Sequence, residues 1–239
     1  MLKEAVILAG GFGTRLQSVV SDVPKPMAPI NKIPFLNYVF DYLKYYQIEH
    51  VVLSTGYLAD KIVEYYKDEF NGIKISYAKE ETPLGTGGGI RIAMAQCKTK
   101  NVLVLNGDSF FDVDLNIHYQ NHILKQADCT LALRKVDNAA RYGTIQLGTA
   151  NIIEAFKEKN DVAKDGLING GVYILNREVY LNKTEENFVF SIEKDFYEKR
   201  IKELNIFGFE YNGYFIDIGI PEDFSKAQTD FRTFKYKQL

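Results

Sequence analysis

The sequence predicts an α/β fold, with a doubly wound, mostly parallel sheet that becomes mixed and is flanked by helices. In the first half of the 239-residue chain, apolar runs of strand length alternate with longer helical patterns. The runs VILA, VVLS and VLVL are apolar throughout. Both faces of their sheet should therefore be covered by helices, which is typical of parallel strands.

The first half is expected to form a Rossmann-like core. The apolar runs predict strands at residues 4–9, 50–55 and 73–78 and within 101–108. The amphipathic patterns between them predict helices at residues 34–47, 59–70 and 88–97. The helix at 34–47 carries an aromatic stripe that should pack on the sheet, formed by Phe35, Tyr38, Val39, Tyr42 and Tyr46.

The pattern of predicted elements changes in the second half of the sequence. After a helix at 115–126 capped by Asp114, short strands are expected at 129–136, 142–147, 152–158 and 167–175, separated by polar stretches. A helix at 191–203, strands within 204–211 and 213–219, and a last helix at 221–231 with Pro221 in its first turn complete the pattern. This part should extend the sheet in mixed or antiparallel fashion. No linker or repeat interrupts the chain, so one domain, 1–239, is expected.

Composition excludes several classes of protein. The net charge of −2 provides no global positive field for nucleic acid, and the end FKYKQL is most simply a solvated tail. Cys97 and Cys129 fit neither a disulfide framework nor a zinc pattern and should be buried and reduced. No signal-like or 18-residue apolar stretch is present, so we expect no membrane partner and a cytoplasmic location.

The stretch LAGGFGTRL, residues 8–16, places glycines directly after the first predicted strand. Ligands bind beyond the carboxyl ends of parallel strands, and glycines let backbone N–H groups approach a phosphate. A dinucleotide fingerprint would need a glycine at Leu16, and a P-loop would need Gly-Lys-Ser/Thr after Gly13. What remains is a glycine loop that carries its own cation, Arg15. Downstream, two prolines stiffen the backbone around Lys25; in isolation this motif also fits a surface lysine in a rigid turn.

Taken together, GGFGTRL and PKPMAP resemble the signature of the sugar-1-phosphate nucleotidyltransferases. Further motifs follow in order: PLGTGGGI (83–90), LNGDSFFDVD (105–114), YGTIQL (142–147), FKEK (156–159), INGGVYIL (168–175) and FIDIGIPEDF (215–224). The pairing of FKEK with INGGVYIL looks most like the bacterial D-glycero-α-D-manno-heptose 1-phosphate guanylyltransferases. The resemblance implies a nucleotide-binding core at 1–114 and a sugar-phosphate-binding part with the C-terminal helix at 115–239.

The resemblance implies transfer of GMP from GTP to the heptose 1-phosphate, giving GDP-heptose and pyrophosphate for capsule, lipopolysaccharide or S-layer glycan synthesis. Arg15 is suited to hold the leaving pyrophosphate, and Lys25 the α-phosphate and the incoming phosphate. Magnesium prefers one or two carboxylates plus phosphate oxygens, and Asp108 and Asp217 are the candidate Mg²⁺ ligands, Asp108 also counting as catalytic. An aspartate after a strand is often only a turn or helix cap.

The resemblance assigns the other residues in these motifs either to the nucleotide or to the sugar phosphate. The nucleotide side comprises Leu8, Ala9, Gly10, Gly11, Gly13, Thr14, Glu80, Gly85, Thr86, Asn106 and Gly107. The sugar-phosphate side comprises Tyr142, Gly143, Glu158, Lys159, Asn169, Gly170 and Gly171. A Gly-Gly pair in a strand also fits a simple bulge.

Glu80 occupies a position where thymidine- and uridine-using relatives commonly carry glutamine. An ionised carboxylate only accepts hydrogen bonds, which suits the adjacent N1–H and N2–H donors of guanine. Glu80 and Glu81 also fit a solvated pair at a strand end.

Alternative interpretations remain open. One is a hexose 1-phosphate nucleotidyltransferase that uses UTP, dTTP or GTP, and another is a non-catalytic regulatory relative. A homodimer is common in the family, but the sequence does not locate an interface. His118 and His122, at i and i+4, match a zinc pair, although an ordinary polar helix face is the simpler interpretation.

Overall fold

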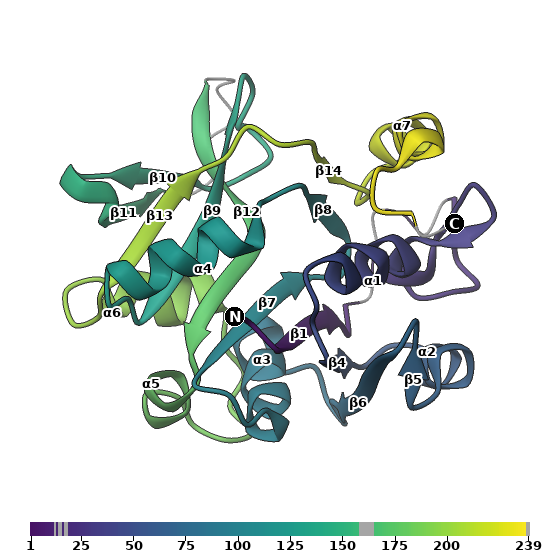
Figure 1. Ribbon diagram of the computed structural model, residues 1–239, viewed down its shortest axis with the longest axis horizontal. Helices are drawn as coiled ribbons and strands as arrows, with labels where there is room; N and C mark the ends of the chain where they lie inside the picture. The colour runs from purple at the N-terminus through teal and green to yellow at the C-terminus, as the bar shows by residue number, and fades with distance from the viewer. Residues whose placement is uncertain (12, 14–15, 17–18, 158–164, 238–239) are drawn as a thin grey trace.

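The computed structural model describes residues 1–239 except 12, 14–15, 17–18, 158–164 and 238–239. Its centre is a ten-stranded mixed sheet (Figure 1). Four strands form the parallel part, in the spatial order β7 (Asn101–Asn106), β1 (Glu4–Ala9), β4 (His50–Thr55) and β6 (Ile73–Lys79). Because successive strands lie side by side and run the same way, their carboxyl ends meet at one edge of the sheet.

The antiparallel extension begins at β12 (Gly166–Asn176), which pairs with β7. β12 also pairs antiparallel with β9 (Cys129–Val136) and β10 (Thr144–Leu147), β10 pairs antiparallel with β11 (Ile153–Lys157), and β13 (Ile206–Glu210) pairs parallel with β9. Two small two-stranded sheets join β8 (Ser109–Phe111) with β14 (Phe215–Asp217), and β2 (Pro29–Ile30) with β3 (Ile33–Pro34). The predicted mixed sheet is confirmed.

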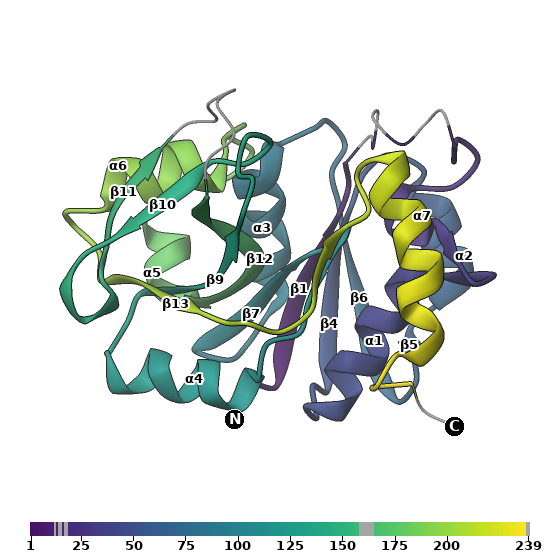
Figure 2. The same cartoon turned by 90° about the horizontal axis from the view of Figure 1, so that it is seen from above.

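Helices cover both faces of the parallel part, as the uniformly apolar strands predict. On β1, Ile7 belongs to the core that includes α1 (Phe35–Tyr45), whereas its neighbour Val6 belongs to the core that includes α3 (Gly85–Gln96). Figure 2 shows α1, α2 (Ala59–Tyr66) and α7 (Pro221–Asp230) on one side of these strands and α3 on the other. The remaining helices are α4 (Leu115–Leu124), α5 (Arg177–Asn182) and α6 (Glu198–Arg200).

Two predicted helices differ from the structure. The helix expected at 59–70 ends at Tyr66, because Lys67 adopts φ 51° and β5 (Glu69–Phe70) turns back to pair with β6. The helix expected at 191–203 begins with wide turns of the π type, η3 (Ile192–Tyr197), before the short α6. The cap at Asp114 is confirmed, since its carboxylate accepts hydrogen bonds from the backbone N–H groups of Asn116 and Ile117.

The prediction of a solvated C-terminal tail is wrong for its aromatic residues. Tyr236 is buried, and its hydroxyl donates to Asp112 Oδ1 at 2.5 Å. Its ring packs against Tyr42 of the aromatic stripe at 5.1 Å between centroids, and Phe234 lies 5.1 Å from Tyr38. The stripe on α1 therefore packs on the chain's own C-terminal segment as well as on the sheet.

The interpretation of His118 and His122 as a polar helix face is also wrong. Both side chains are buried, because α4 lies against the sheet. His122 lies 2.8 Å from Thr130 Oγ1 and 3.2 Å from Asn101 Oδ1, and His118 Nδ1 lies 3.1 Å from the Tyr211 hydroxyl. Burial lowers the pKa of His118 to about 3 and that of His122 to about 4.

Cys97 and Cys129 are free and buried, as expected. Burial raises the pKa of the Cys97 thiol to about 12, which keeps it protonated. None of the helices in the described ranges is long and apolar enough to cross a membrane.

Candidate active site

A cavity of about 450 Å³ opens at the carboxyl ends of β1 and β7, where the predicted glycine loop begins. Its lining comes from five separate stretches of the sequence: Leu8, Gly10, Gly11, Gly13, Lys25, Pro26, Glu80, Pro83, Gly85, Thr86, Asn106, Gly107, Asp108 and Gly219. Of the described residues predicted on the nucleotide side, all but Ala9 line this cavity; Ala9 is buried in the core that includes α1. We call it the nucleotide cavity.

Glycines hold the floor of this cavity close together. Gly107 N donates to the Leu8 carbonyl at 2.9 Å, and a Cβ on Gly107 would lie 2.3 Å from that same oxygen. Gly13 adopts φ +58°, and a Cβ there would lie 3.0 Å from Lys25 Cβ. The glycine loop and the PKP stretch therefore depend on each other's shape.

Lys25 lies at the centre of the charged part of the site. The PKP stretch begins a single 3₁₀ turn, η1 (Lys25–Met27). The Lys25 side chain is 8% exposed, and its Nζ donates to Asp108 Oδ2 at 2.6 Å and to Asp217 Oδ1 at 3.4 Å. A rigid, nearly buried ammonium is consistent with an aimed lysine and inconsistent with a surface lysine in a turn.

The fold brings Asp108 and Asp217 together from distant parts of the chain. Asp108 follows β7 and begins the turn into β8, and Asp217 ends β14, which pairs with β8. Ile218 N donates to the Asp108 carbonyl at 3.0 Å, so the two backbones are locked side by side. Asp217 Oδ1 also accepts from Gly219 N at 2.8 Å.

These two carboxylates fit a divalent cation. Their oxygens already converge on one cationic atom, Lys25 Nζ, and the Asp108 side chain is 41% exposed toward the cavity. In the described ranges no group of three or more His, Cys, Asp or Glu side chains is placed to hold a metal ion. A metal held here would need further oxygen ligands, and the phosphates of a nucleotide are the ligands that Mg²⁺ commonly shares with one or two carboxylates.

Glu80 reaches the nucleotide cavity from the end of β6. Its Oε2 accepts from Leu84 N at 2.8 Å and its Oε1 accepts from Ser54 Oγ at 3.1 Å. A Cβ on Gly10 would lie 2.6 Å from Glu80 Oε1, and one on Gly89 would lie 2.9 Å from it. The carboxylate is thus fixed between two glycines and does not behave as half of a solvated pair with Glu81.

A second cavity, of about 240 Å³, adjoins the first and shares Asn106 and Asp108 with it. We call it the sugar cavity. The described residues predicted on the sugar-phosphate side all line it: Tyr142, Gly143, Asn169, Gly170 and Gly171. Asp217 lines it too, so both candidate metal ligands face this cavity.

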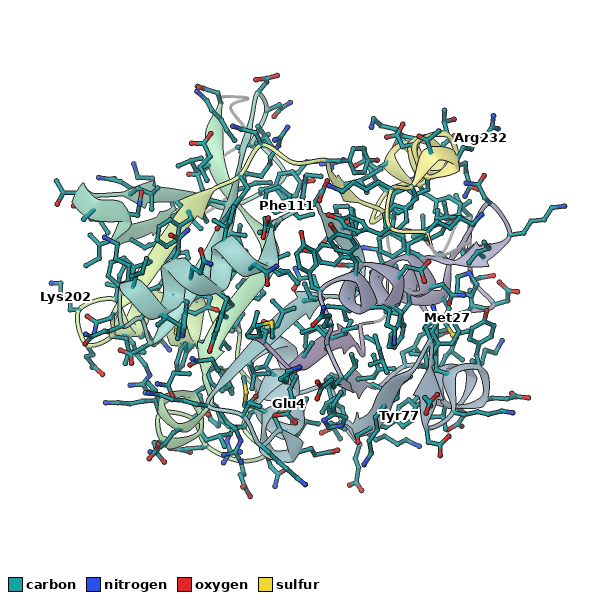
Figure 3. All side chains as sticks on the ribbon, viewed as in Figure 1. Glu4, Met27, Tyr77, Phe111, Lys202 and Arg232 are labelled. Carbon is teal, nitrogen blue, oxygen red and sulfur yellow. The ribbon has the colours of Figure 1, made fainter. Side chains whose placement is uncertain are left out.

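The Gly-Gly pair forms a bulge that also shapes the sugar cavity. The pairing of β12 with β9 is interrupted between Asn169 and Tyr173, and Gly171 adopts φ +74°. A Cβ on Gly170 would lie 2.3 Å from the ring of Phe111, the β8 residue labelled in Figure 3. Asn169 Oδ1 accepts from Gly171 N at 3.0 Å, which fixes the amide toward the cavity.

Sequence reasoning missed several lining residues. In the sugar cavity these are Ser109, Arg141, Glu193 and Phe215, and in the nucleotide cavity Pro26, Pro83 and Gly219. Arg141 Nη2 donates to Asp223 Oδ2 at 2.8 Å and to the Tyr142 hydroxyl at 2.7 Å. The position of Arg141 directly before the Tyr142-Gly143 motif is the sequence feature that could have identified it. Glu193 is brought in by the π-type turn and had no comparable signal.

Four predicted residues lie outside the described residues: Thr14 and Arg15 of the glycine loop, and Glu158 and Lys159 of FKEK. Their assignments stay predictions.

Comparison with known proteins agrees with the fold and with the family that the sequence motifs resemble. A family model described as "Nucleotidyl transferase" matches residues 4–233. The chain is 47% identical over 227 residues to D-glycero-alpha-D-manno-heptose 1-phosphate guanylyltransferase of Aneurinibacillus thermoaerophilus, covering 95% of this chain and 97% of the relative. It is 43% identical over 222 residues to the protein of the same name from Campylobacter jejuni, covering 92% and 96%.

Among solved structures, HddC from Yersinia pseudotuberculosis matches with a TM-score of 0.84 at 34% identity, covering 96% of this chain and 100% of that one. A structure of HddC complexed with GMP-PN matches with a TM-score of 0.83 at the same identity and the same coverage.

Proposed function

Because the chain belongs to the nucleotidyl transferase family and is an enzyme of the sugar-1-phosphate guanylyltransferase type, we propose that it transfers GMP from GTP to D-glycero-α-D-manno-heptose 1-phosphate. The products are GDP-heptose and pyrophosphate. The choice of GTP and of the heptose is supported by the names of the two relatives at 47% and 43% identity and by the GMP-PN complex of HddC.

The observation that carries the proposal is the junction of the two cavities. Asn106 and Asp108 line both, and Lys25 Nζ lies 2.6 Å from Asp108 at this boundary. A nucleoside triphosphate in the first cavity and a sugar 1-phosphate in the second would bring the α-phosphorus and the attacking phosphate oxygen together at this point. Holding two reactants in line is itself a large part of phosphoryl-transfer catalysis.

The reaction forms one bond and breaks one. An oxygen of the sugar phosphate attacks the α-phosphorus of GTP, and the bond from that phosphorus to the bridging oxygen of the β-phosphate breaks. The electron pair leaves with pyrophosphate. Both reactants are anions, so the Lys25 ammonium offsets their repulsion and the negative charge that develops on the equatorial oxygens.

We assign Mg²⁺ to Asp108 and Asp217. When bound, the ion neutralises phosphate charge and orients the triphosphate. Lys25 would then exchange its carboxylate partners for phosphate oxygens, which are the same kind of acceptor. Arg15 and Lys159 keep the roles predicted from the sequence, on pyrophosphate and on the sugar phosphate.

Glu80 is assigned to guanine recognition. Its carboxylate faces the nucleotide cavity from a fixed position, and the two hydrogen bonds that hold it leave lone pairs for the adjacent N–H donors of guanine. GTP is a metabolite of the cytoplasm, so the proposed reaction belongs there.

A matrix of nucleotides and sugars tests the proposal. Pyrophosphate release is measured with GTP, ATP, CTP, UTP and dTTP, each paired with the heptose 1-phosphate, mannose 1-phosphate and glucose 1-phosphate. The proposal expects the highest kcat/KM for GTP with the heptose 1-phosphate. A preference for UTP or dTTP would refute the base assignment, and a preference for a hexose 1-phosphate would refute the sugar assignment.

A further inference from the structure

We propose that a small side pocket beyond the sugar cavity binds the exocyclic carbon chain of the heptose, and that Glu193 is the residue that makes the site specific for a seven-carbon sugar. This inference rests on the function proposed above. A heptose differs from the corresponding hexose only in its exocyclic chain. One additional hydroxyl-bearing carbon lengthens the chain on carbon 5.

The side pocket has a volume of about 70 Å³ and shares Gly143, Asn169 and Glu193 with the sugar cavity. The side pocket is much smaller than the sugar cavity of about 240 Å³ that it adjoins, and its size suits a short chain of a few heavy atoms. The space therefore matches the additional part of a heptose.

The position of the side pocket relative to the candidate metal ligands also fits a heptose. Asp108 and Asp217 line the sugar cavity but not the side pocket, and they mark the end where the anomeric phosphate must lie. The side pocket opens where Gly143, Asn169 and Glu193 lie. A sugar whose phosphate lies at the Lys25 end can extend its exocyclic chain past these three residues.

The walls of the pocket suit a diol. Besides Glu193 they include the polar side chains of Thr144, Lys157, Lys194 and Glu198. The floor is apolar, because Phe156 stacks on Tyr197 with ring centroids 5.6 Å apart. Carboxylates accept hydrogen bonds from hydroxyl groups and lysine donates to them, while an apolar floor suits the C–H face of a carbon chain.

Glu193 is held at the mouth of the pocket by two sets of contacts. Its Oε1 accepts from Asn169 Nδ2 at 2.7 Å, and the same amide nitrogen donates to the Tyr173 hydroxyl at 2.8 Å. The neighbouring Ile192 N donates to Thr86 Oγ1 at 3.0 Å, in the first turn of α3. The turn that carries Glu193 is thus fixed to an element that lines the nucleotide cavity, and the bond to Asn169 holds the carboxylate where the side pocket meets the sugar cavity, in a position to accept from ligand hydroxyls.

The test compares two sugars on the same variants. Glu193→Gln keeps the shape of the side chain and an oxygen for Asn169, but it loses the charge. Glu198→Gln changes a residue that lines the side pocket and does not line the sugar cavity. Glu154→Gln, an exposed residue of β11 outside the three cavities, is the matched control. The KM for the heptose 1-phosphate is measured directly, and mannose 1-phosphate is assayed as a competitor, so its Ki is obtained whether or not it is turned over.

We expect Glu193→Gln to raise the KM for the heptose 1-phosphate by about tenfold or more, while the Ki of mannose 1-phosphate changes by about twofold or less. Glu198→Gln should change the two constants in the same unequal way, and Glu154→Gln should change neither. Equal changes for both sugars, or none, would overturn the inference while leaving the proposed function intact. A wild-type enzyme that does not turn over the heptose 1-phosphate would instead refute the proposed function.

Discussion

Lys25 Nζ lies 2.6 Å from Asp108 Oδ2, although the two residues are 83 positions apart in the chain. Asp217, a further 109 positions along, lies 3.4 Å from the same nitrogen. Three segments thus place opposite charges at the boundary of two cavities. The Lys25 side chain is only 8% exposed, and a charge held away from water is costly unless it is paired, so the convergence of this ammonium with two carboxylates indicates a site built to exchange partners with charged ligands.

The first prediction concerns the metal. Replacing Asp217 by Asn removes one anionic ligand, so the Mg²⁺ concentration for half-maximal activity should rise by at least about tenfold. Activity is measured across a Mg²⁺ titration after treatment with a chelator. Asp60→Asn, an exposed change on α2, serves as the control and should leave the titration unchanged. An unaltered Mg²⁺ dependence in Asp217→Asn would remove this residue from the metal site.

The second prediction concerns the base. In Glu80→Gln the side chain keeps its size and position, but one acceptor atom becomes a donor that faces the N–H groups of guanine. The kcat/KM for GTP should fall by about 10²-fold, because buried polar groups would be left unpaired. The change should be much smaller for UTP. Glu81→Gln, next in the chain and exposed, is the control. Equal effects on GTP and UTP would show that Glu80 does not read the base.

The third prediction concerns pH and stability. Burial lowers the pKa of His118 to about 3 and of His122 to about 4, below the usual 6.5 of an unfolded histidine. Between about pH 6.5 and pH 4 the unfolded state therefore binds more protons than the folded state. The free energy of unfolding should fall with decreasing pH in this window, by up to about 1.4 kcal/mol per pH unit for each histidine.

Urea unfolding at pH 7 and pH 5 measures this effect. His122→Asn should show a shallower pH dependence than the wild type over the same window, because one of the two groups no longer titrates. A wild-type stability that is constant from pH 7 to pH 5, or an unchanged slope in the variant, would contradict the neutral buried state of these residues.

Much of the fold could be predicted because it depends on local pattern. The strands at 4–9, 50–55 and 129–136 begin and end at the predicted residues, since each is built around a short run rich in apolar residues. Pro221 opens α7 as expected, because a proline fits the first helical turn. The early end of α2 at Tyr66 could not be predicted, because it depends on the pairing of β5 with β6.

The candidate site also contains residues that the sequence could predict and residues that it could not. Lys25, Asp108 and Asp217 lie in motifs with a recognisable order, and the fold brings them together. Glu193 is an ordinary acidic residue in a helical pattern, and its place in the sugar cavity depends on a π-type turn fixed to α3. The burial of His118 and His122 likewise required partners from other strands, which no i, i+4 spacing reveals.

The most direct test of the central claim is pyrophosphate release from GTP and the heptose 1-phosphate by the wild type and by Lys25→Ala. The wild type should turn over, and the variant should lose about 10²- to 10³-fold in kcat, because the ammonium at the boundary of the two cavities is gone. Lys74→Ala, an exposed change on β6, should behave as the wild type, and thermal unfolding should show that both variants fold. Full activity in a folded Lys25→Ala enzyme would contradict the account.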